Sequence, residues 1–137
     1  MKDRRMILST LWIFAMFNYL YADVLAVMDP ELMKVIASGG VGVVTMTQGF
    51  LLGAAVLMET AIAMVLLSRI LSFRANKIAN IAAGILHTAA VAASMFVGSK
   101  PTLYYAFFAC IEIPCTLFII AYAWKWKPAV LPAAAVA

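Results

Sequence analysis

The chain has 137 residues, of which 66% are hydrophobic and 12% charged, and it carries a net charge of +4. A soluble domain is about half apolar and about a quarter charged, so this composition, with a mean hydropathy of +1.03, indicates a membrane protein instead. The basic residues are scattered over short segments rather than gathered on one face, which argues against a nucleic-acid-binding surface.

Four apolar segments are long enough to cross a bilayer, which needs about 20 residues per helix. They span residues 7–27, 46–68, 78–98 and 102–123. We therefore predict an all-α fold, an integral membrane four-helix bundle that forms a single domain over residues 1–127. The Pro- and Ala-containing tail, residues 128–137, is predicted to be disordered.

The first segment follows a basic start and therefore has to be distinguished from a signal peptide. Its apolar run is longer than a typical signal core, and no clear cleavage site of small residues follows it, so we expect it to remain as a helix. After it, Asp29 and Pro30 predict the start of a short helix, Pro30 to Ser38, at the outer interface. Residues 72–77 predict a basic turn between the second and third spans, and Pro101 is expected to open the fourth.

The distribution of Lys and Arg predicts the orientation. Two basic residues, Lys34 and Lys100, fall on one side of the predicted membrane. Eight fall on the other: Lys2, Arg4, Arg5, Arg69, Arg74, Lys77, Lys125 and Lys127. By the positive-inside rule, both termini are expected in the cytoplasm.

Each predicted span carries a strongly polar residue near its middle: Asn18, Glu59, His87 and Glu112. Ionisable groups at this depth are costly, and they usually face the bundle interior and serve a function. Two carboxylates that share a site of low dielectric cannot both ionise cheaply, so at least one of them should hold a proton. We predict that Glu59, His87 and Glu112 form a buried cluster, with Asn18 beside it, that binds or moves a proton or a small cationic or polar ligand.

Helical spacing adds further polar side chains to this cluster. At about 100° per residue, Gln48 and Glu59 lie within ~20° of each other around their helix, so Gln48 is expected to orient the cluster. Three more polar side chains are predicted to line a route to the outer face: Tyr21, Asp23 and Tyr105.

Metal binding is the next alternative, since two carboxylates and an imidazole can hold a divalent ion. The Glu-x-x-His signature of di-iron bundles is absent, because Ile62 follows Glu59 at the third position and Cys115 follows Glu112. A single histidine in the chain also excludes bis-histidine haem within one chain. We predict no metal and no cofactor.

A structural reading stands beside the functional one. The same polar residues could act as hydrogen bonds between helices, and Gly49-x-x-x-Gly53 could let two helices approach closely. In that case the protein is a non-catalytic membrane subunit with a larger partner protein. Four helices are few for a transporter, so we also consider a homodimer. An intramembrane enzyme acting on a lipidic substrate ranks third, so we favour a protein that is not an enzyme.

One stretch also supports a family resemblance. Residues 11–23, LWIFAMFNYLYAD, together with Asp29-Pro30 and Met58-Glu59, resemble a family of small bacterial four-helix membrane proteins that is known only as a domain of unknown function. The resemblance implies this architecture and a location in the bacterial inner membrane, with the lipid bilayer as surroundings, but it implies no activity. More loosely, the four-helix plan is similar to that of DoxX-like proteins.

Overall fold

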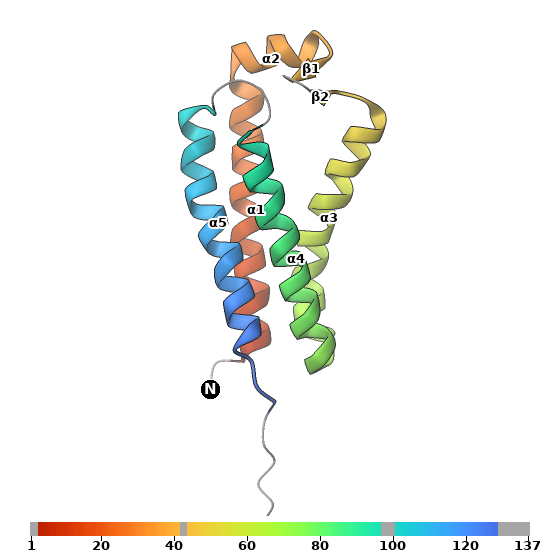
Figure 1. Ribbon diagram of the computed structural model, residues 1–137, viewed down its shortest axis with the longest axis vertical. Coiled ribbons are helices and arrows are strands. Elements are labelled where there is room, and N and C mark those ends of the chain that lie inside the picture. The colour runs from red at the N-terminus through yellow and green to blue at the C-terminus, as the bar shows by residue number, and fades with distance from the viewer. Residues whose placement is uncertain (1–2, 42–43, 97–100, 129–137) are drawn as a thin grey trace, which may run out of the picture.

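The computed structural model describes residues 3–41, 44–96 and 101–128. Within these residues the chain forms, in order, α1 (Arg4–Met28), α2 (Pro30–Ala37), β1 (Gly40–Val41), β2 (Val44–Thr45), α3 (Gln48–Ile70), α4 (Phe73–Ser94) and α5 (Leu103–Trp124) (Figure 1). Four of these helices, α1, α3, α4 and α5, are long and apolar enough to cross a membrane. The predicted all-α four-helix bundle is confirmed, and it indicates a multi-pass membrane protein.

The four long helices form a ring in which neighbours run in opposite directions (Figure 1). α1 packs against α3 and α5, and α4 packs against α5 and α3. The α4–α5 contact is especially close: a Cβ atom added at Gly84 would lie 2.6 Å from Cγ1 of Ile120. A glycine is therefore required where these two helices meet.

The two halves of the bundle differ in packing. Toward the end where α1 begins, large side chains such as Leu8, Trp12 and Ile119 are fully buried. Toward the other end α3 leans away from the other helices (Figure 1), and residues 48–56 are all exposed. The bundle is therefore tightly packed at one end and loosely packed at the other.

Side-chain caps and one glycine set the ends of the shorter elements. The carboxylate of Asp29 accepts hydrogen bonds from the backbone N–H groups of Glu31 and Leu32, and Pro30 occupies the first turn, as expected for the start of α2. Gly39 has a φ of 99°, a value that suits glycine, and it leads into an antiparallel pair in which Gly40 faces Thr45. This small hairpin was not predicted.

The predicted basic turn at residues 72–77 is wrong, because α4 already begins at Phe73. The side chain of Asn76 is fully buried and donates a hydrogen bond to the carbonyl of Ser68 at 2.6 Å. It thereby satisfies a carbonyl in the last turn of α3, so only Leu71 and Ser72 connect the two helices. The other predicted spans agree with the helices within three residues at each end.

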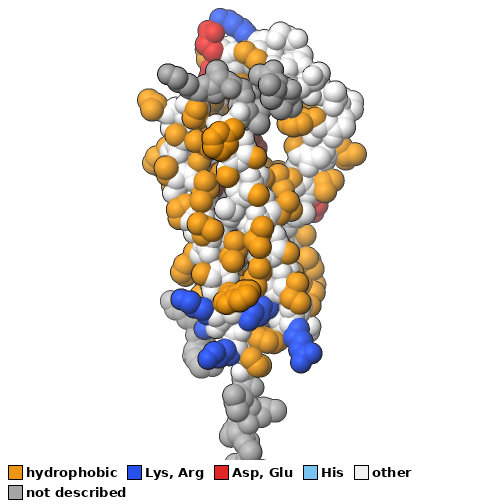
Figure 2. Space-filling model, viewed as in Figure 1, with side chains coloured by type: hydrophobic (Ala, Val, Ile, Leu, Met, Phe, Trp, Pro, Cys, Tyr) orange, Lys and Arg blue, Asp and Glu red, His pale blue; other side chains and the backbone are white. Residues whose placement is uncertain are grey.

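Basic side chains gather at the tightly packed end of the bundle (Figure 2). There Arg4 lies over the ring of Tyr122 at 4.8 Å, and Lys77 lies over the ring of Trp124 at 5.7 Å. Lys34 lies in α2 at the opposite end, paired with Glu31. Aromatic rings and long basic side chains are the usual anchors of a helix end at a membrane surface. Lys2, Lys100 and the tail beyond residue 128 lie outside the described residues.

Candidate functional site

Several groups of polar side chains lie inside the described bundle, and three of them bear on a functional site. The first is a network near the basic end. The indole of Trp12 donates a hydrogen bond to Oδ1 of Asn80 at 2.8 Å, and the hydroxyl of Ser68 donates to the same oxygen at 3.2 Å. The amide of Asn80 donates in turn to Oδ1 of Asn76 at 2.6 Å. These buried groups satisfy one another and connect three helices, which is the arrangement expected of a structural network.

His87 forms the second group, near the middle of the bundle, and only 2% of it is exposed. Its Nε2 lies 2.9 Å from Oγ1 of Thr60, and that hydroxyl donates its own hydrogen to the carbonyl of Leu57 at 2.6 Å. Because the hydroxyl has one hydrogen, Oγ1 must accept from Nε2, which places a hydrogen on this nitrogen. The ring of Tyr19 stacks on the imidazole at 5.4 Å, and Trp12 meets it edge-on at the same separation.

Glu112 and Tyr19 form the third group, above His87 toward the loosely packed end. Each side chain is 95% buried, yet Oε1 of Glu112 and the hydroxyl of Tyr19 make no hydrogen bond with any described residue. A buried polar atom without a partner costs about 1–3 kcal/mol. Such atoms are rare in folded proteins, and each calls for an explanation.

The surroundings of Glu112 are acidic and phenolic. Its carboxyl group lies within electrostatic range of Asp23 and of the hydroxyls of Tyr19 and Tyr105. Tyr105 is half-buried, and its hydroxyl donates to Oγ of Ser94 at 2.6 Å, which ties α5 to α4. No described Lys or Arg side chain neutralises the charge of these two carboxyl groups, because the described basic residues lie near the two ends of the bundle.

Asp23 connects this buried group with the surface. It is exposed on α1, one turn beyond Tyr19, and it lines a shallow hollow together with Val24, Val27 and Met28. The hollow is lined by residues of α1 alone, at the loosely packed end of the bundle.

The structure does not bring the predicted cluster of Glu59, His87 and Glu112 together. Glu59 is exposed on the outside of α3, whereas its neighbour Thr60 reaches His87. Adjacent residues of a helix point about 100° apart, so only one of the two can face the interior. The sequence argument assigned that position to the carboxylate, and this was wrong.

Three further predicted residues also lie away from the interior. Asn18 donates to the carbonyl of Phe14 in its own helix at 2.8 Å, and the ring of Tyr21 is 61% exposed. Gln48 is the exposed first residue of α3, on the same outward face as Glu59. Glu112, Tyr105 and Asp23 remain near one another from the predicted set, whereas His87 is buried in a separate group.

Tyr19 and Thr60 are two polar residues beside His87 that the sequence argument did not include in the site. A usable signal was present for Tyr19, because Trp12, Ala15, Tyr19 and Ala22 follow the three- and four-residue spacing of one buried helical face. Thr60 gives no comparable signal, since a threonine can satisfy its hydroxyl within its own helix.

Among residues 3–41, 44–96 and 101–128, no group of three or more His, Cys, Asp or Glu side chains is placed to hold a metal ion. Cys115 is buried beside the carbonyl of Leu11, and Cys110 is exposed on another side of α5.

Comparison with known proteins gives a family and no activity. No curated protein and no solved structure matches the chain. A family model described as a family of unknown function (DUF6326) matches residues 1–133, which is nearly the whole sequence, and the chain belongs to that family.

Proposed function

We propose that this protein lies in the bacterial inner membrane with both termini in the cytoplasm. We propose further that it binds or moves a proton or a small cationic or polar ligand at Glu112, with residues 1–127 acting as one domain. Tyr19, Asp23 and Tyr105 complete the site, and the ligand reaches it from the outer face.

The unsatisfied carboxyl group of Glu112 carries this proposal. A carboxyl group that served only to join helices would be hydrogen-bonded, as Asn80 is in the network at the basic end. Oε1 of Glu112 is instead buried without a hydrogen-bond partner among the described residues, and so is the hydroxyl of Tyr19. Together they supply an acceptor and a donor for a bound ligand, and the carboxyl group is also a proton carrier.

The direction of access is supported by the distribution of charge. Both described ends of the chain, Asp3 and Pro128, lie at the basic end, which the positive-inside rule assigns to the cytoplasm. Asp23 and Tyr105 are then near the outer surface.

The test compares two glutamates of the same chain. In proteoliposomes that contain a pH-sensitive dye, a pH step applied outside is expected to drive proton uptake by the wild-type protein. Glu112→Gln should abolish this uptake, because the amide keeps the shape of the side chain but does not titrate. Glu59→Gln, on the outside of the bundle, should leave the uptake unchanged.

An infrared pH titration of the purified protein serves as an independent readout of the same site. The carboxylic acid band that changes with pH should lose a component in Glu112→Gln. Proton uptake and titration that are both unaffected by Glu112→Gln would contradict the proposal, provided that the variant is folded.

The exposed position of Glu59 favours a second function, that of a membrane subunit that associates through α3. Loss of association in Glu59 variants, without loss of proton uptake, would show that the two roles are separate.

A further inference from the structure

Glu59 lies in the middle of a helix that is long enough to span a membrane, where an ionisable side chain is least favourable. It lies at the centre of α3, eleven residues from Gln48 and eleven from Ile70, so about 16 Å of helix separates it from either end. Figure 2 shows an acidic side chain on the α3 side of the bundle, among hydrophobic side chains and far from both ends, and Glu59 is the only acidic residue of α3. At this depth a carboxyl group cannot reach the membrane surface and needs a partner in protein.

The face that surrounds Glu59 has the pattern of a helix–helix interface. Leu52, Glu59 and Leu66 are seven residues apart, and Val56 and Ile62 lie between them on the same side of the helix. These four apolar side chains are between 45% and 65% exposed, so no other helix of the same chain covers them. We define this set as the α3 face.

The beginning of α3 is also open to a neighbour. A Cβ atom added at Gly53 would meet nothing within 4 Å, and one added at Gly49 would meet only Thr47 of the same segment. The Gly49-x-x-x-Gly53 motif was expected to promote close helix packing, but no helix of the described chain packs on it.

We infer that the α3 face binds the α3 face of a second copy of this chain, and that the two Glu59 carboxyl groups meet on the two-fold axis. A second copy of the chain fits this face because, in a two-fold symmetric contact, a residue on the axis meets the same residue of the other copy. Each Glu59 would then have the other Glu59 as its partner. A neutral carboxyl group is both a donor and an acceptor, so two of them can form a reciprocal pair of hydrogen bonds. The described spans contain no basic side chain at this depth that could serve Glu59 instead.

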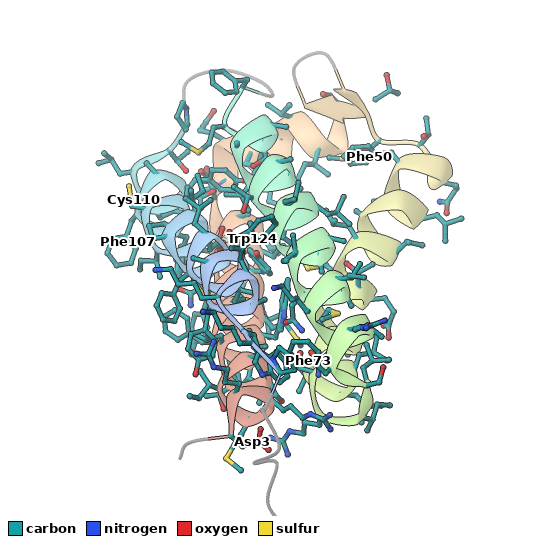
Figure 3. The ribbon with its side chains drawn as sticks, turned by 60° about the horizontal axis from the view of Figure 1, so that its bottom comes forward. Asp3, Phe50, Phe73, Phe107, Cys110 and Trp124 are labelled. Atoms are coloured by element: carbon teal, nitrogen blue, oxygen red, sulfur yellow. The ribbon has the colours of Figure 1, made fainter. Side chains whose placement is uncertain are left out.

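Disulfide cross-linking in the membrane tests the geometry. In a background of Cys110→Ser and Cys115→Ser, the variants Glu59→Cys and Leu66→Cys should each give a covalent dimer on oxidation. Leu66→Cys should cross-link more completely, because Glu59→Cys also removes the paired carboxyl groups. The matched control keeps the native Cys110, which is exposed on α5, away from the α3 side of the bundle (Figure 3), and it should not cross-link. Cross-linking through Cys110 but not through positions 59 and 66 would overturn the inference.

Energy transfer between labelled copies in lipid vesicles tests the chemistry. Glu59→Ala should raise the dissociation constant of the dimer roughly tenfold to hundredfold, since two hydrogen bonds between helices are lost. Glu59→Gln should stay near the wild-type value, because an amide can also pair with itself. A wild-type protein that remains monomeric, or a dimer that is insensitive to Glu59→Ala, would refute the inference.

Neither measurement depends on proton uptake at Glu112, so failure of this inference and failure of the proposed function are distinguishable. A cross-link from position 59 to a different protein in native membranes, with none to a second copy, would also contradict the inference.

Discussion

Replacing Glu112 by methionine should stabilise the bundle, and this outcome separates a functional carboxyl group from a structural one. Methionine has a similar length and no polar atom. The change removes Oε1, which is buried without a partner at a cost of about 1–3 kcal/mol. The substitution breaks no side-chain hydrogen bond among the described residues. Thr116 donates to the backbone carbonyl of Glu112, and methionine keeps that carbonyl. We therefore expect the free energy of unfolding to rise by ~1–3 kcal/mol.

The free energy of unfolding can be measured in bicelles by steric trapping or by titration with a denaturing detergent. Glu112→Gln provides the comparison: it keeps the volume but adds amide hydrogens that also need partners, so little or no gain in stability is expected. If both variants were less stable than the wild type by more than about 1 kcal/mol, Glu112 would be a structural hydrogen-bonding residue. That result would refute the interpretation that Glu112 lowers the stability of the bundle and is present because it serves a function.

Three further predictions follow from the packing and from the proposed path. Gly84→Ala should lower the free energy of unfolding by about 1–3 kcal/mol because the new methyl group overlaps α5, whereas Gly53→Ala, which points into open space, should be neutral or slightly stabilising in the same assay. Asn80→Ala should cost ~2 kcal/mol or more because it leaves buried donors without an acceptor, whereas Asn18→Ala, which loses only a bond within its own helix, should cost less than about 0.5 kcal/mol. Asp23→Cys, in a background without the native cysteines, should react in whole cells with a maleimide that cannot cross the membrane, and protection from the outside reagent would contradict outer access.

The number and depth of the helices could be predicted from sequence because both depend on composition along the chain. An apolar stretch of about 20 residues has few alternatives to a spanning helix. The start of α2 was also predictable, since Asp29 and Pro30 act on their own neighbours. The start of α4 was not predictable in this way: it depends on the long-range bond between Asn76 and Ser68.

The direction in which a polar side chain points was harder to predict than its depth. Glu112 and His87 are buried as expected, whereas Glu59 and Gln48 face outward. Gln48 and Glu59 share one face of α3, as their spacing predicted, but spacing alone does not say which side of the helix meets the bundle. In α3 the apolar residues surround the helix on all sides, so its sequence gives no direction. The looser DoxX-like resemblance stays a prediction.

The unequal packing of the two halves of the bundle favours one side of the membrane for access to the proposed site. Opening the bundle at the basic end would break the hydrogen bonds of Asn80 and expose Trp12, which is fully buried. Opening the other end requires less, because the first nine residues of α3 are already exposed. A ligand that entered past Asp23, as we propose, would meet Glu112 before it met the closed half. A dimer formed through α3 would hold the outer face of that helix in place, and movement at the open end would then fall on α4 and on α1 and α5, which carry the proposed site.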